Sequence, residues 1–222
     1  MALNADVLAL GEAFWTWRAA TQPLSGDDIP RIERPAGWAP DWSPDAIAER
    51  RKALARFDRE HAALSKAIAS ASVQDQVDWR LLGSAIARVH WELDVPRGWQ
   101  RNPQFYVHQT LGAIFEALLT PPPFGRDLLA RLESIPRTLE AARENLAADA
   151  VRPFAELALS SLGDIVPRLS SVEREVAPHL KTPAGQEFAN AGRALERFAE
   201  WLRGHLDSMS NETAIGRQAY VE

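Results

Sequence analysis

The 222-residue sequence contains no cysteine and no long run of apolar residues. Without cysteine, the chain can form no disulfide, no thiolate nucleophile and no Cys-ligated zinc or iron–sulfur site. No stretch approaches the roughly 18 consecutive apolar residues that a membrane helix needs, so no membrane partner is expected. The N-terminus lacks a basic segment and places Asp6 where a signal peptide would be apolar, which predicts a cytoplasmic protein.

An excess of positive charge is also missing. The 25 Lys and Arg residues are outnumbered by 30 Asp and Glu residues, which gives a formal net charge of −5. Proteins that bind nucleic acid usually carry a basic surface that neutralises phosphates, so nucleic acid is not expected as a partner. With 46% hydrophobic and 25% charged residues, the composition is that of an ordered globular protein.

Standard catalytic motifs are absent as well. The sequence has no Gly-x-Ser-x-Gly elbow, no phosphate-binding glycine loop and no dinucleotide fingerprint. Asp27-Asp28 lies in a proline-rich stretch and is predicted to form a turn, not a magnesium–diphosphate site.

The five histidines show no metal-ligating pattern. The nearest approach to a zinc-protease helix is His90-Trp91-Glu92-Leu93-Asp94. Residues two apart on a helix point about 200° away from each other, so His90 and Glu92 cannot chelate one ion; a surface pair of His90 with Asp94 is predicted instead. His61 falls in the apolar seam of a helix and is predicted to be half-buried and hydrogen-bonded. We therefore predict no catalytic and no metal-ligating residue in this chain.

What is present is helical spacing of apolar residues along nearly the whole sequence. Leu82, Ile86, Val89 and Leu93, for example, recur at intervals of three or four and mark one buried helix face. The pattern predicts an all-α fold: a compact bundle of about seven helices in a single domain over residues 1–222. The expected helices cover 4–20, 44–68, 74–95, 103–119, the residues after Gly125 (broken or kinked at Pro136), the residues from Pro153 (interrupted at Pro167) and 183–206.

A strap rich in proline and tryptophan interrupts this pattern near the N-terminus. Residues 23–44 contain five prolines, which forbid regular helix. Trp38 and Trp42 are predicted to pack the strap onto the helices, because a solvated linker would rarely carry two tryptophans. Three more tryptophans, Trp79, Trp91 and Trp99, cluster in the sequence; core packing is the favoured interpretation, and an aromatic-lined pocket is the alternative.

Two further blocks carry a family resemblance. The first is DQVDWRLL at residues 75–82, followed by WQRNPQFY at residues 99–106. The second is RLESIPRTL at residues 131–139, continuing to Ala141 and Asn145-Leu146. In order and spacing they resemble the N-terminal half of the bacterial DUF885 family, with its W-x-x-N-P-x-x-Y and R-L-x-x-I/L-P segments. The ending IGRQAY at 215–220 is similar to the transition toward that family's second half.

The resemblance implies a fold and a partner but no catalytic residue here. Members of the family look like predominantly helical zinc hydrolases of the gluzincin type, with the His-Glu-x-x-His helix and a further Glu ligand in the C-terminal half. It implies that this chain forms one wall of a substrate groove, with zinc held by the other half. Trp99, Asn102 and Tyr106 are then the candidates to face substrate; alternatively, Asn102 caps a helix and both aromatic residues pack.

Three functions stay open at this point. The chain is the non-catalytic N-terminal half of a zinc-dependent peptidase or amidase, which docks on its catalytic half or self-associates through an exposed apolar face. Alternatively, it is a stand-alone helical binding module. A metal-free enzyme that uses carboxylates in a Trp-lined pocket is the third and least supported possibility.

Overall fold

The computed structural model describes residues 2–24, 33–119, 122 and 124–221. These residues form helices joined by short connections, and the part of the chain described in this way contains no β-strand, only one isolated bridge between Val151 and Ser210. The all-α prediction is confirmed. Seven α-helices of ten residues or more lie within the described ranges: α1 (Ala2–Thr21), α2 (Pro44–Ala63), α4 (Val73–Asp94), α8 (Arg126–Leu146), α9 (Arg152–Ser161), α10 (Ile165–Val176) and α11 (Gly185–His205).

Shorter elements connect these helices. They are α3 (Ser65–Ile68), α5 (Gly98–Arg101), α6 (Pro103–Val107), the π-helical turn η1 (His108–Gly112), α7 (Ala113–Leu118), the 3-10 turns η2 (Ala177–His179) and η3 (Leu206–Ser208), and α12 (Arg217–Val221). No helix among the described residues is long and apolar enough to cross a bilayer.

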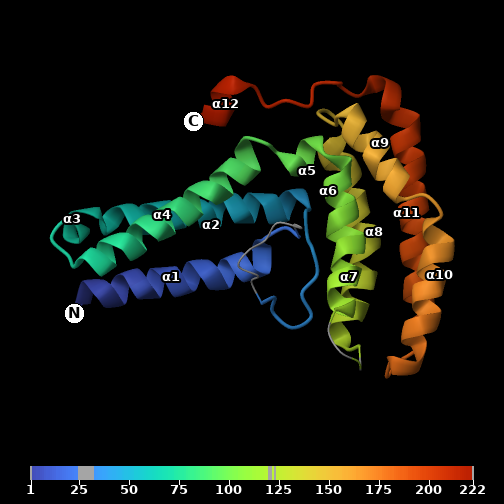
Figure 1. Ribbon diagram of the computed structural model, residues 1–222, viewed down its shortest axis with the longest axis horizontal. Helices are drawn as coiled ribbons and strands as arrows, with labels where there is room; N and C mark the ends of the chain where they lie inside the picture. Colours follow the sequence, from blue (N-terminus) through green and yellow to red (C-terminus); the bar gives the residue numbers. More distant parts are fainter. Residues whose placement is uncertain (1, 25–32, 120–121, 123, 222) are drawn as a thin grey trace. The chain divides into compact units, whose positions relative to one another are not determined.

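Tertiary contacts group the chain into two compact units. The first comprises Met1–Gln22 and Asp45–Pro96, and the second comprises Pro23–Pro44 and Arg97–Glu222. The first unit contains α1 to α4 and the second contains α5 to α12; Figure 1 labels these helices. The prediction that residues 1–222 make one domain stays a prediction.

The first unit is a layer of three long helices with an aromatic centre. The Phe14 ring of α1 meets the Phe57 ring of α2 edge-on, with ring centroids 5.4 Å apart, and both side chains are fully buried. The predicted stripe of α4 is buried as well. On the same helices, the buried Arg18 pairs with Glu92 at 2.5 Å, and Arg88 approaches Glu92 at 3.0 Å.

A stacked histidine–tryptophan pair joins α2 and α4 in this unit. The His61 and Trp79 rings lie parallel, 4.4 Å apart, and His61 Nε2 lies 2.9 Å from the Trp79 carbonyl oxygen. Trp79 Nε1 donates in return to the His61 carbonyl at 3.1 Å. The prediction of a half-buried, hydrogen-bonded His61 is confirmed. The stack is possible because residue 83 on α4 is glycine: a Cβ there would lie 2.8 Å from His61 Cε1.

In the second unit, α11 packs along α8 and α10. The apolar spacing within the predicted helix 183–206 marks a buried face, and in α11 this face is buried from Phe188 to Leu202. α8 runs unbroken through Pro136, so a break at this residue is excluded. A proline inside a helix costs about 3 kcal/mol, and burial of the neighbouring Leu132, Ile135 and Leu139 side chains offsets this cost.

Two predicted details differ from the structure. The interruption expected at Pro167 lies earlier: α9 ends at Ser161, and Pro167 belongs to the first turn of α10, where proline loses no intrahelical hydrogen bond. The apolar spacing of the predicted helix 103–119 places Phe115 on its buried face, whereas the Phe115 side chain is 65% exposed. The turn η1 explains this, because a π-helical turn closes on the fifth residue and shifts the register of the residues that follow. The turn expected at Asp27-Asp28 lies outside the described residues.

The Gly83–His61 contact predicts that the effect of Gly83→Ala on stability depends on the His61 side chain. In an exposed helix interior, Gly to Ala stabilises by about 0.5–1 kcal/mol. Gly83→Ala in the natural chain is expected to lose this gain, because the added methyl displaces the His61 ring from Trp79. In a His61→Ala background the same substitution should stabilise the protein. Urea denaturation of the four variants measures both effects, and an equal effect of Gly83→Ala in both backgrounds would contradict the contact.

Candidate functional site

The three residues predicted to face substrate lie together at the junction of α5 and α6. Trp99 lies in α5 and is 9% exposed, Asn102 is the N-cap of α6, and Tyr106 in α6 is fully buried. The Asn102 side chain accepts a hydrogen bond from the Gln104 N–H at 2.9 Å, which satisfies one of the free donors of the first helical turn. The structure therefore shows the predicted cap, and a substrate-facing role for the three residues stays a prediction.

Tyr106 joins three segments of the second unit through its hydroxyl group. The hydroxyl donates to the Trp99 carbonyl at 2.7 Å and accepts from Asn145 Nδ2 at 2.8 Å. Asn145, near the end of α8, also donates to the Trp42 carbonyl of the strap at 2.8 Å. The two sequence blocks, around residues 99–106 and 131–146, thus meet at one buried hydroxyl.

Polar side chains spaced seven residues apart on α8 bind α7 and the strap. Arg131 donates to the Ala113 carbonyl at 2.7 Å, Thr138 to the Pro40 carbonyl at 3.2 Å, and Asn145 to the Trp42 carbonyl. A spacing of seven places the three side chains on one helix face. Sequence reasoning did not identify this row, although polar residues at a heptad interval on an apolar face were a usable signal.

The two tryptophans of the strap pack as predicted, with 8% of Trp38 and 4% of Trp42 exposed. The Trp42 ring meets Phe105 edge-on at 4.7 Å. Two guanidinium groups lie near the Trp38 ring, that of Arg34 at 4.1 Å and that of Arg131 at 5.6 Å from the ring centroid. Cation–π attraction adds to the apolar burial of this ring.

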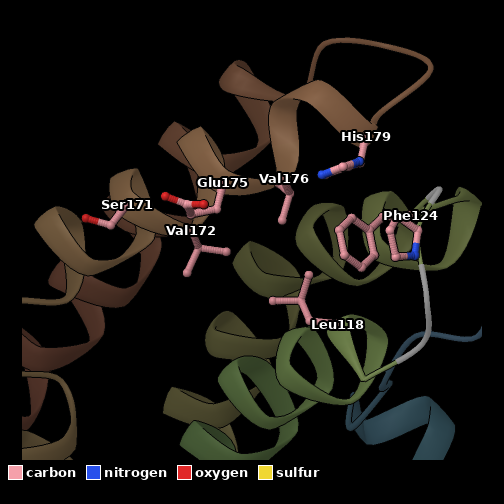
Figure 2. Close-up of a pocket in the computed structure, with 8 residues that line it drawn as sticks. Leu118, Phe124, Ser171, Val172, Glu175, Val176 and His179 are labelled. Atoms are coloured by element: carbon pink, nitrogen blue, oxygen red, sulfur yellow. The ribbon is translucent and has the colours of Figure 1, made fainter.

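A cavity of about 430 Å³ opens elsewhere in the second unit. Figure 2 shows α10 on one side of it and, on the other, Leu118 at the end of α7 and Phe124. Its lining residues are Leu118, Pro122, Phe124, Ser171, Val172, Glu175, Val176 and His179. The lining is mainly apolar, which suits the apolar part of a ligand. Sequence reasoning missed this cavity, because Leu118 and α10 are about fifty residues apart along the chain.

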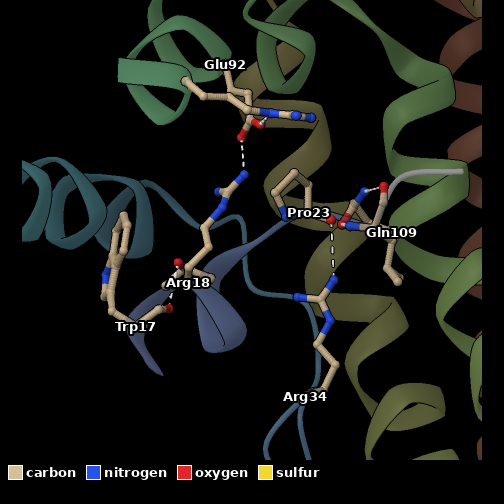
Figure 3. A network of polar contacts seen from close by, with 9 residues as sticks. Trp17, Arg18, Pro23, Arg34, Glu92 and Gln109 are labelled. Atoms are coloured by element: carbon tan, nitrogen blue, oxygen red, sulfur yellow. Dashed lines mark hydrogen bonds and ion pairs between the residues drawn. The ribbon is translucent and has the colours of Figure 1, made fainter. Parts of the chain in front are cut away.

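The π-helical turn η1 provides a further anchor for the strap. The buried Gln109 side chain accepts from the Leu24 N–H at 2.9 Å and donates to the Leu24 carbonyl at 3.0 Å. Arg34 donates to the Pro23 carbonyl at 3.3 Å. Figure 3 shows these contacts and, within the first unit, the pair of Arg18 with Glu92. π-helical turns are frequent at functional sites, but here both the oxygen and the nitrogen of the buried Gln109 amide bind the backbone of Leu24.

The predicted pair of His90 with Asp94 is present but long. His90 Nδ1 lies 3.9 Å from Asp94, and His90 Nε2 makes the closer contact with Asp58 of α2, at 2.8 Å. Nothing in the sequence near His90 pointed to Asp58, which is 32 residues away. Among the described residues, no three His, Asp or Glu side chains gather in a way that could hold a metal ion.

Trp79, Trp91 and Trp99 do not form one aromatic cluster. Trp79 stacks on His61, Trp91 is 45% exposed, and both belong to the first unit, whereas Trp99 is buried in the second unit. Packing accounts for Trp79 and Trp99, in line with the favoured interpretation.

Comparison with known proteins gives a family and a fold. The model of the family described as "Bacterial protein of unknown function (DUF885)" matches residues 28–222. A solved structure of a candidate lipoprotein of unknown function from Shewanella oneidensis is similar in fold, with a TM-score of 0.51 and 18% sequence identity. The match covers 94% of this chain and 38% of the other. No curated protein matches the sequence.

The hydrogen bonds at Tyr106 give a second prediction. Tyr106→Phe removes the donor to the Trp99 carbonyl and the acceptor for Asn145, and an unsatisfied buried polar group costs about 1–3 kcal/mol. Asn145→Ala should cost a similar amount. Because the two side chains share one hydrogen bond, the double variant should cost less than the sum, by roughly 0.5 kcal/mol or more.

Urea denaturation measures these differences. Ser208→Ala is the matched control, since it removes an exposed hydroxyl that donates to the His205 carbonyl and should change stability by less than about 0.5 kcal/mol. Additive costs of the Tyr106 and Asn145 substitutions would contradict the shared hydrogen bond.

Proposed function

Because the chain belongs to the DUF885 family of bacterial proteins of unknown function, we propose that it is the non-catalytic helical half of a zinc-dependent peptidase or amidase. In this proposal it forms one wall of the substrate groove. The observation that carries the proposal is the coverage of the fold match: 94% of this chain corresponds to only 38% of the solved structure. More than half of that structure thus has no counterpart here, and we assign the chemistry to a corresponding part.

The described residues do not fit a zinc site, since they offer no group of three ligands. We therefore assign no step through zinc to this chain. We propose that its role is to support the substrate groove. The buried Tyr106 hydroxyl and the polar side chains of α8 hold the segments of the second unit together, as one wall of a groove requires.

An exposed apolar face on the first unit supports the docking part of the proposal. Val73, Val77 and Leu81 follow one another at intervals of four along α4 and are 78%, 43% and 64% exposed. Trp91, 45% exposed, falls on the same face of the helix. We call these four residues the α4 stripe. Exposed apolar side chains that gather on one helix face are typical of an interaction site, and we propose the catalytic half as the occupant of this one.

A second function has its own support. The apolar cavity beside α10 is compatible with a stand-alone binding module. The coding DNA around this sequence discriminates between the two functions. A His-Glu-x-x-His motif in frame, or in an adjacent gene whose product copurifies with this chain, favours the half-enzyme, and its absence favours the binding module.

We also propose a cytoplasmic location, because a sequence without cysteine fits a reducing compartment. Cell fractionation tests this, and recovery of the protein with membranes would contradict it.

For the purified chain alone, we expect no stoichiometric zinc and no hydrolysis of peptide or amide substrates. Elemental analysis after dialysis and a peptide-library assay measure the two. Zinc at one equivalent that is lost on His61→Ala or His90→Ala would overturn the assignment of the metal to another part of the protein.

The α4 stripe gives a test that needs no partner. Without its occupant, the wild-type chain should self-associate, and Val77→Asp with Leu81→Asp should make it monomeric, because two charges then interrupt the apolar surface. Sedimentation velocity at rising concentration measures this, and circular dichroism checks folding. Leu157→Asp is the matched control, since Leu157 on α9 is 53% exposed and outside the stripe. A strictly monomeric wild type, or equal effects of both substitutions, would contradict a docking role.

A further inference from the structure

We propose that the cavity beside α10 binds a protonated amine carried on an apolar body. This inference does not depend on the half-enzyme, because every group that it uses lies in the second unit of this chain. It therefore goes beyond the function proposed above.

The apolar part of the cavity is suited to one bulky group. Leu118 and Phe124 face Val172 and Val176 across the space in Figure 2. Its volume of about 430 Å³ lies within the range of roughly 300–1,000 Å³ that is common for small-molecule sites. An aromatic ring with a short alkyl chain fits within this space and would bury its surface against the two valines.

The polar part lies along one edge of α10 and η2. Ser171, Glu175 and His179 follow at intervals of four, so that each lies about one helical turn beyond the last. Ser171 is already engaged, since it donates to the Pro167 carbonyl and accepts from Arg174 Nη2. The His179 ring stands edge-on to Phe124, with centroids 6.1 Å apart.

The negative charge of Glu175 determines which ligand charge the cavity favours. Glu175 is one of the residues that line the cavity, and it forms no hydrogen bond or ion pair with any of the residues that the structure describes. The nearby cation Arg174 does not line the cavity and is held by Ser170 and Ser171. A ligand carboxylate or phosphate would meet the like charge of Glu175, whereas an ammonium group would be attracted to it and to the face of Phe124.

This chemistry has two sources: a free aralkyl amine, or the N-terminal residue of a peptide with a large apolar side chain. The probes are therefore 2-phenylethylamine, its N-acetyl derivative, 3-phenylpropionate, and phenylalanyl-glycinamide with a free and with an acetylated N-terminus. Binding is measured by isothermal titration and by shifts in the NMR spectrum of the full chain. Either amine binding better than its acetylated form supports the site, and the tighter of the two identifies the source.

Glu175→Gln keeps the shape of the side chain and removes its charge, and should weaken amine binding about fivefold or more. Glu200→Gln, an exposed glutamate on α11, is the matched control and should leave binding unchanged. Val172→Phe should abolish binding by filling the cavity, with circular dichroism as the check on folding. No amine binding at about 10 mM, equal binding of the acetylated probes, tighter binding of 3-phenylpropionate, or no effect of Glu175→Gln would each overturn the proposal.

Discussion

The hydrogen bonds from α8 to the strap are the constraint on which the second unit depends. A segment with five prolines cannot form a regular helix, so it lacks the regular set of backbone hydrogen bonds that a helix gives its carbonyl groups. Packing the strap against helices buries these groups, and a buried carbonyl without a donor is costly. Thr138 and Asn145 provide the donors, at Pro40 and Trp42, and Gln109 does the same at Leu24.

This arrangement explains the two sequence blocks without invoking catalysis. Tyr106 from the first block and Asn145 from the second share a hydrogen bond, and Asn102 caps the helix that carries Tyr106. A motif whose residues satisfy one another in this way specifies a fold. Among the described residues, the α4 stripe and the cavity beside α10 remain available to other molecules; the cavity lies outside those blocks, whereas the stripe includes Val77 and Leu81 of the first block.

The fold match covers 94% of this chain but only 38% of the solved structure, and the described residues of this chain contain no cluster of three His, Asp or Glu side chains. In the first unit, charged side chains pair with one another, as Arg18 does with Glu92 and His90 with Asp58. Apolar side chains on α4 stay exposed, which is unfavourable in water unless something covers them. A supporting half with a docking face accounts for both observations.

The sequence by itself determined the helices and most of the buried faces. The stripes of α4 and α11, the cap at Asn102 and the packing of Trp38 and Trp42 follow from local spacing and side-chain size, which act over one or two turns. Only the tertiary structure decided that α8 passes through Pro136, that η1 turns Phe115 outward, that His90 pairs with Asp58, and that Glu175 lines an apolar cavity. Each of these depends on residues far apart in the chain, whose packing energy outweighs local preference and has no one-dimensional pattern.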